Sequence, residues 1–170
     1  MKRRQFLGRA VSPILVSAGM LSVAGCLSES DASGASVLGA VVITNRNDER
    51  HIVDFRVRWD GETVHESTHE VEGRTDDGSV DGAVPAKTWP DEPGQFTVSA
   101  RTQGSDWNTV NPADRKYPEC YGVTVAISEE GRLVIYTATN EYECSDEALQ
   151  YNREAANESN ASAQTAPPQS

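Results

Sequence analysis

The fold is decided by the stretch Val53-Asp54-Phe55-Arg56-Val57-Arg58-Trp59, in which apolar and charged residues strictly alternate. This period of two is typical of a β-strand with one buried face and one charged face. Asp60-Gly61 follows directly, and this dipeptide favours the tight turn of a β-hairpin. Residues 62–71 continue as the partner strand, which is weaker and more polar.

Further strands are predicted on both sides of this hairpin. They cover residues 40–45, 95–102, 121–127 and 132–139, with polar turns at 46–50 and 129–131 and a loop at 72–82. Helical periodicity is absent between residues 37 and 144. We therefore predict an all-β domain over residues 37–144, a single immunoglobulin-like or fibronectin-like β-sandwich of about seven strands. A small closed β-barrel is the alternative.

The core of this domain depends on few large side chains, because aromatic residues make up only 6% of the chain. We expect Trp59, Trp89 and Phe96 to be its large members. Trp89 stands beside Pro90, so a half-exposed position at an edge of the sandwich is the alternative for this residue.

Residues 1–25 have the layout of a secretory signal, because a basic start precedes an uncharged stretch of apolar and small residues. The run Arg3-Arg4-Gln5-Phe6-Leu7 resembles the twin-arginine export signal, carried by Arg3, Arg4, Phe6 and Leu7. The resemblance implies export in a folded state. A permanent membrane helix is the alternative, but such a helix needs about 20 apolar residues, and this stretch is shorter.

The signal ends in Val23-Ala24-Gly25-Cys26, which resembles a lipobox, the motif at which a lipid is joined to a cysteine before cleavage. The resemblance implies that Cys26 anchors the processed chain to the extracytoplasmic face of the cell membrane. Residues 26–36 would then form a lipidated, flexible tether. The alternative is a buried structural cysteine that happens to follow the signal.

The chain of 170 residues carries a net charge of −11, and removal of residues 1–25 takes away four basic residues and no acid, which gives −15. This acidity argues against a nucleic-acid partner, since phosphate binding needs clustered lysine and arginine. Low lysine with dense Asp and Glu is similar to proteins of extreme halophiles. Together with the two motifs above, the chain resembles a haloarchaeal surface lipoprotein. An acidic protein of a mesophile is the alternative.

Cys120 and Cys144 remain once Cys26 carries a lipid. Cys120 opens a predicted strand and Cys144 follows its hairpin partner, so both ends return to one place around the turn near Glu130. Because an exported location is oxidising, we expect a disulfide that contributes about 3 kcal/mol. Two free thiols or a metal-binding pair are the alternatives, although a structural zinc site needs four ligands.

The C-terminal stretch 145–170 is polar, and we predict that it forms a disordered tail. A short helix at about residues 146–156, with Ser145 as its N-cap, is the alternative. Asn157 and Asn160 each begin an Asn-x-Ser triplet, which makes them candidates for glycosylation.

The sequence has no clear signature of catalysis or of cofactor binding, and we expect neither a cofactor nor a metal. His65 and His69 share one face of a predicted strand, where their spacing is too long for one metal ion. A Gly-x-Ser-x-Gly elbow and a glycine-rich phosphate loop are both absent. Asp76, Asp77 and Asp81 are weak candidates for Ca²⁺, although no glutamate closes this loop as in an EF-hand, and a solvated acidic loop is the alternative.

These observations favour a non-enzymatic lipoprotein that displays a β-sandwich outside the cytoplasmic membrane, as a binding or envelope-structural module with an envelope protein as partner. The alternative is an accessory subunit of a surface transporter or redox complex, or a small enzyme with an unrecognised site. A binding module should expose a patch with tyrosine and tryptophan. An enzyme should hold a concave pocket with convergent polar groups.

Overall fold

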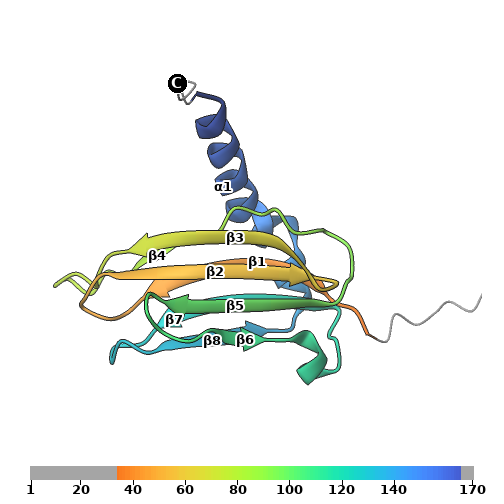
Figure 1. Cartoon of the computed structure of the whole chain (residues 1–170), viewed down its shortest axis with the longest axis horizontal. Coiled ribbons are helices and arrows are strands. Elements are labelled where there is room, and N and C mark those ends of the chain that lie inside the picture. The colour runs from red at the N-terminus through yellow and green to blue at the C-terminus, as the bar shows by residue number, and fades with distance from the viewer. Residues whose placement is uncertain (1–33, 166–170) are drawn as a thin grey trace, which may run out of the picture. The chain divides into compact units, whose positions relative to one another are not determined.

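The computed structural model describes residues 34–165, with side chains up to residue 158. Two four-stranded sheets, in the orders β4-β1-β7-β8 and β3-β2-β5-β6, lie one on the other (Figure 1). The predicted all-β sandwich is therefore confirmed. The strands are β1 (Val37–Asn45), β2 (His51–Trp59), β3 (Glu62–Val71), β4 (Asp81–Ala83), β5 (Phe96–Thr102), β6 (Asn108–Val110), β7 (Cys120–Ile127) and β8 (Leu133–Ala138).

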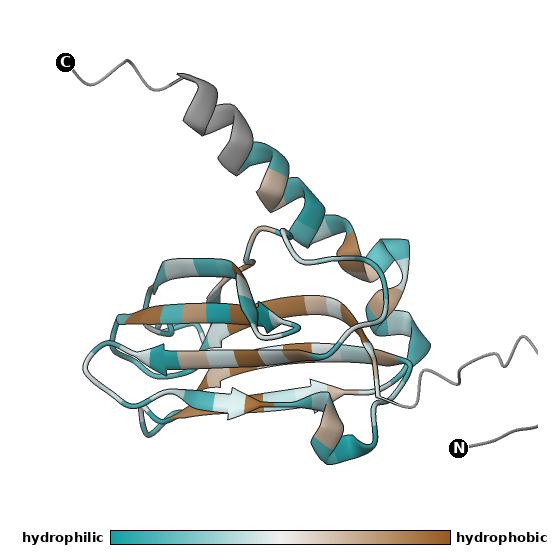
Figure 2. Ribbon diagram, turned by 45° about the vertical axis from the view of Figure 1, so that its right-hand side comes forward, coloured by the Kyte–Doolittle hydropathy of each residue, from teal (hydrophilic) through white to brown (hydrophobic). Residues whose placement is uncertain are grey.

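The alternating stretch of the sequence becomes β2, which lies between β3 and β5. Val53, Phe55 and Val57 are fully buried, whereas Asp54 and Arg56 lie partly exposed on the opposite face. Figure 2 shows the alternation as apolar and polar bands along the strands. A slip of one residue would turn the charged side chains into the core, so the pattern also holds the register.

The three large side chains expected in the core are all buried there. Trp59, Trp89 and Phe96 have exposed fractions of 8%, 3% and 2%. The Trp59 ring stacks on the Phe96 ring, with 5.3 Å between their centroids. Trp89 therefore does not lie at a half-exposed edge. Its indole Nε1 can be buried because it donates a hydrogen bond to the carbonyl oxygen of Leu38 at 3.1 Å.

β4 and β6 are the two strands that the sequence does not reveal. The described residues contain eight strands, whereas the sequence pattern locates six and predicts about seven. Each has three residues, mostly exposed, at the edge of a sheet. The stretch 72–82, predicted as a loop, contains the start of β4. Three polar residues are too few to produce a periodic pattern, so only their pairing with β1 and β5 defines these strands.

The predicted disulfide joins Cys120 and Cys144, whose Cα atoms are 5.9 Å apart. Cys120 begins β7, and Cys144 ends η2 (Glu141–Cys144), a 3₁₀ helix that follows β8. A second 3₁₀ helix, η1 (Pro112–Arg115), connects β6 to β7. Gly39 of β1 lies against η2, where a Cβ atom would collide with the carbonyl group of Glu143.

The prediction of a disordered tail is wrong for residues 146–165, which form the helix α1 (Asp146–Thr165). The alternative of a helix capped by Ser145 is confirmed, since the Ser145 hydroxyl accepts a hydrogen bond from the Ala148 amide at 3.2 Å. Two side chains dock this helix. Leu149 is 3% exposed and Asn152 is 1% exposed.

Asn152 explains why so polar a segment is ordered. Its side chain accepts a hydrogen bond from the Val41 amide at 3.2 Å, and it donates to the carbonyl oxygens of Val41 at 2.8 Å and Pro85 at 2.9 Å. These are backbone groups of β1 and of the segment before Trp89, and they would otherwise be buried without partners. The Asn152 side chain therefore makes the hydrogen bonds with Val41 that a neighbouring strand would otherwise make.

Candidate functional site

The residues of the export and anchor motifs, Arg3, Arg4, Phe6, Leu7 and Cys26, lie outside the described residues. Of the two glycosylation candidates, Asn157 is exposed on α1. Asn160 lies in the same helix, beyond the last described side chain.

The three weak calcium candidates do not converge on one point. Asp77 accepts hydrogen bonds from the Thr75 hydroxyl and from the Ser79 amide, and these lower the pKa of its carboxyl group to about 2. Asp81 instead accepts from the Glu72 amide at 2.7 Å. Within residues 34–158, no three histidine, cysteine or acidic side chains are placed to hold a metal ion.

His65 and His69 do not share a metal ion but are bridged by a serine. The Ser67 hydroxyl lies 2.8 Å from Nε2 of each ring. The other nitrogen of His65, Nδ1, lies 2.9 Å from the Thr88 hydroxyl, which donates its own proton to the carbonyl oxygen of Val64. These residues form one polar chain along the inward side of β3.

The protons of this chain have one consistent direction. Because the Thr88 hydroxyl donates to Val64, it must accept from Nδ1–H of His65. Nε2 of His65 then accepts from Ser67, and Ser67 accepts from Nε2–H of His69. Both rings are neutral in this arrangement. Burial lowers the pKa of both histidines, and for His65 the nearby His69 adds to this effect.

Ser67 and His65 are thus a hydroxyl and a base in contact, the arrangement that activates serine nucleophiles. However, His65 is 8% exposed, and its ring packs between Phe55 and Trp89, with centroids 5.6 Å from each. The pair therefore belongs to the edge of the core.

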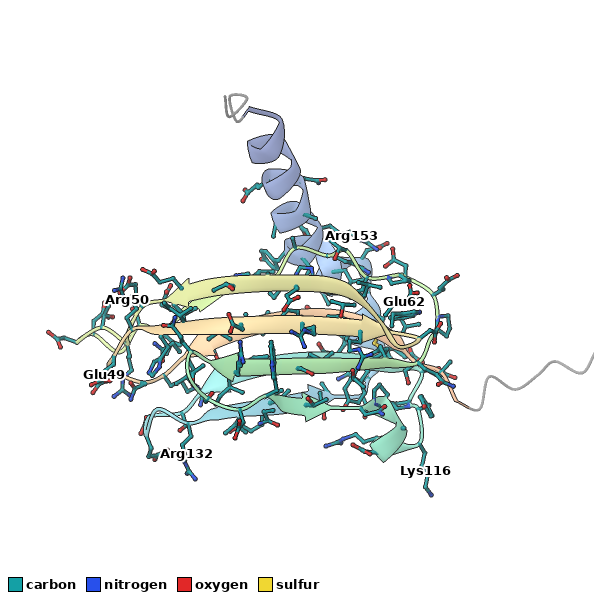
Figure 3. The ribbon with its side chains drawn as sticks, viewed as in Figure 1. Glu49, Arg50, Glu62, Lys116, Arg132 and Arg153 are labelled. Carbon is teal, nitrogen blue, oxygen red and sulfur yellow. A yellow bond between two sulfur atoms is a disulfide. The ribbon has the colours of Figure 1, made fainter. Side chains whose placement is uncertain are left out.

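The most distinctive surface is the outer side of the sheet β3-β2-β5-β6, which we call the charged face. Figure 3 shows polar side chains covering these strands. By register and ring contact it consists of Asp54, Arg56, Arg58, Glu66, Thr68, Thr97, Ser99, Arg101, Trp107 and Thr109. Three arginines from two neighbouring strands gather here, in a chain whose net charge is −11.

Trp107 organises the centre of the charged face. The guanidinium carbons of Arg56 and Arg101 lie 4.3 Å and 4.5 Å from the centroid of its ring. Arg56 also pairs with Glu66 at 2.8 Å, and Arg101 pairs with Asp54 at 2.9 Å. The Arg101 hydrogen bond lowers the pKa of the Asp54 carboxyl group. The cluster is therefore held rigidly although it is partly exposed.

Arg56 has an unused donor in this cluster. Its Nε atom is buried and finds no hydrogen-bond partner in the described part of the chain. The rest of the side chain is 31% exposed, so the guanidinium group is only partly covered. The guanidinium group of Arg56 is thus stacked and paired, while its Nε atom is shielded from an incoming partner.

A hollow of about 330 Å³ opens at one end of the charged face. Its walls are Arg58, Asp60, Gly61, Gln95, Phe96, Thr97, Asn111 and Tyr117. Arg58 donates a hydrogen bond to the carbonyl oxygen of Gly61, and within residues 34–158 it makes no ion pair. The walls contain no histidine, cysteine or serine, but they offer amide, hydroxyl and guanidinium groups, the Asp60 carboxylate and two aromatic rings.

Sequence reasoning identified the charged face of β2 but missed Trp107, which lies in the connection between β5 and β6. The available signal was a tryptophan directly after Gly104-Ser105-Asp106, where a loop rarely needs a large aromatic residue. Its two partners are distant in sequence or on the neighbouring strand, so only the fold brings them together.

Comparisons with known proteins give no further indication of function: no protein-family model and no curated protein matches the sequence, and no solved structure matches the fold. None of the helices within residues 34–165 has the length and apolar character needed to cross a bilayer.

Proposed function

We propose that this chain is a non-enzymatic binding module that is exported, anchored by a lipid on Cys26 and displayed outside the cytoplasmic membrane. The motifs at residues 3–7 and 23–26 support the export and the anchor. The acidic composition supports a surface protein of an extreme halophile. The β-sandwich would then stand off the membrane on the tether formed by residues 26–36.

The observation that carries the binding role is the cluster of Trp107, Arg56 and Arg101 beside the hollow at Arg58. Tryptophan and arginine are the residues most enriched in the parts of interfaces that dominate affinity. The arginines are already oriented by Asp54, Glu66 and the indole ring, so little conformational entropy is lost when a partner binds.

The chemistry of the face indicates the kind of partner. Arg58 in the hollow makes no ion pair within residues 34–158, so its guanidinium group favours a carboxylate or another anionic acceptor. Gln95, Asn111 and Tyr117 add neutral polar groups around the same hollow. A polar segment of an envelope protein, with an acidic group placed against Arg58, fits this surface.

Affinity capture from native membranes in high salt, followed by mass spectrometry, tests this proposal. The full chain should retain one specific partner, and the Arg58→Ala/Trp107→Ala double variant should lose it. Tyr151→Ala is the matched control, because Tyr151 is a 65% exposed aromatic residue on α1, outside the charged face. Equal capture by the wild type and the double variant would refute a binding role for this face.

The anchor is tested separately with Cys26→Ala. We expect this variant to appear in the medium or to remain an unprocessed precursor. Normal processing together with retention in the membrane would rule out lipidation at Cys26.

A further inference from the structure

The outer side of the second sheet differs from the charged face because no charged residue stands at an outward position of its strands. We call it the uncharged face. By register, its outward positions are Val42, Thr44, Gly82, Gly122, Thr124, Ala126, Val134, Tyr136 and Ala138. Tyr136 is 58% exposed on the outermost strand. Charged side chains reach this face from outside its strands: Glu143 lies over Gly122, and Arg46, Glu129 and Glu130 border the end of the face near Tyr136.

The edge of this sheet is also unprotected. β8 pairs with β7 on one side, and on its other side it has no strand neighbour among the described residues. Its sequence, Leu-Val-Ile-Tyr-Thr-Ala, contains no charged residue and no proline, and every residue of it is at least partly exposed. Edge strands normally carry lysine, proline or a cover, because their free N–H and C=O groups recruit another strand.

The other three edge strands do not have this character. β4 and β6 have only three residues each, and β3 carries Glu62, Glu66 and Glu70 along its exposed side. β8 is therefore the one long, uncharged edge among the strands of residues 34–165.

We propose that β8 pairs antiparallel with β8 of a second copy of this chain. The two four-stranded sheets then join into one continuous sheet, and the two uncharged faces lie side by side. A two-fold axis relates the copies, which is the commonest symmetry of soluble homodimers. The pairing brings each Tyr136 near its counterpart, where aromatic cross-strand contacts stabilise a sheet.

The charges support a second copy as the occupant. At the net charge of −11, a contact through the acidic surfaces would bring like charges together, whereas the edge strand β8 contains no charged residue. Arg132, which precedes β8, projects outward with 80% of its side chain exposed (Figure 3). Glu141 follows the strand, at the start of η2. Antiparallel pairing puts the start of one β8 beside the end of the other, so Arg132 of each copy approaches Glu141 of the partner subunit.

Cross-linking in native membranes tests the contact directly. The full chain is prepared with Tyr136→Cys and, as a control, with Tyr151→Cys on α1; the replaced side chains are 58% and 65% exposed. Mild oxidation should convert the first variant into covalent dimers and leave the second as single chains. Absence of dimers for Tyr136→Cys, or equal dimer formation by both variants, overturns the proposal.

Sedimentation of the detergent-solubilised full chain provides the second test. The wild type and Tyr151→Lys should sediment as dimers. Tyr136→Lys places two like charges opposite each other and should weaken the association at least about tenfold. Circular dichroism identical to that of the wild type shows that each variant is folded. A monomeric wild type contradicts pairing between copies, also where a different protein is found bound to β8 in membranes. A Tyr136→Lys variant that dimerises as strongly as the wild type contradicts it as well. The test does not involve Arg58 or Trp107, so its failure leaves the proposed role of the charged face untouched.

Discussion

The two outer faces of the sandwich are built from strands of similar length, yet their chemistry is opposite. The charged face carries Asp54, Arg56, Glu66 and Arg101, whose ionic and cation–π contacts fix their side chains. Arg58 lies on the same face without an ion pair within residues 34–158. The uncharged face carries small and apolar residues around Tyr136. Both faces cover one shared core, so stability alone does not require the difference. The surface chemistry of each sheet is therefore independent of the shared core, which is expected if each sheet meets a different partner.

The largest effect on stability is expected when the disulfide is removed. The disulfide belongs to the sheet with the uncharged face, so its removal should affect that sheet more than the other. Replacing Cys120 and Cys144 with serine should lower the free energy of unfolding by about 3 kcal/mol. Denaturant unfolding under native salt measures this loss.

Hydrogen exchange then locates the loss of stability. β7 and the docked start of α1 should exchange faster in the variant, since η2 is no longer held to Cys120. Equal acceleration in β2 and β3 would show that the disulfide supports both sheets alike, which would weaken the comparison.

The second largest effect on stability is expected from salt, which screens the repulsion between the acidic side chains. The processed chain carries −15, and its repulsion extends over about 30 Å at 10 mM salt but only about 3 Å at 1 M. We expect a markedly lower melting temperature in dilute buffer than in molar KCl, measured by circular dichroism. A melting temperature that does not change with salt would remove the physical support for a halophilic protein.

Acidification should protonate His65 and His69 and thereby destabilise the sheet β3-β2-β5-β6. Both pKa values are lowered by burial from the ordinary 6.5, so the unfolded state binds more protons below that pH. Stability is therefore complete above pH 6.5 and falls as the pH drops below it, before carboxylates with ordinary pKa values near 4 titrate.

The matched test of this pH dependence is the double variant His65→Asn/His69→Gln. Its stability should be flat between about pH 6.5 and 5, where only the histidines titrate. If wild-type stability is equally flat in that window, the chain through Ser67 does not hold the rings neutral.

The smallest effect is expected from Trp107→Ala. The indole ring contributes a cation–π contact to Arg56 and another to Arg101, each worth about 0.5–1 kcal/mol at an exposed position. The free energy of unfolding should therefore fall by about 1 kcal/mol, while partner capture is lost. A loss of several kcal/mol would mean that Trp107 is a structural residue, and the case for a binding face would weaken.

The sequence predicts those elements whose structure is determined by a local pattern of apolar and polar residues. The alternation from Val53 to Trp59 determines a strand, its buried side and its charged side, because a strand has a period of two. The disulfide followed from a hairpin that returns Cys144 to Cys120. β4 and β6 could not be predicted, because three polar residues have no periodicity.

The remaining errors arise from single long-range contacts. α1 is docked mainly through Leu149 and Asn152. The hydrogen bonds of Asn152 depend on backbone groups of Val41 and Pro85, which no local pattern reveals. Trp107 acquires its role only after β2 and β5 pair and present Arg56 and Arg101 to it. The uncharged face likewise becomes visible only when β1, β7 and β8 are placed in register.

The separate use of the two faces is tested most directly by native mass spectrometry of complexes captured from membranes. The wild-type chain should be found as two copies with the partner bound. Arg58→Ala/Trp107→Ala should retain two copies and lose the partner, whereas Tyr136→Lys should retain the partner and lose the second copy. If either variant removes both the partner and the second copy, the faces do not act separately and the account is contradicted.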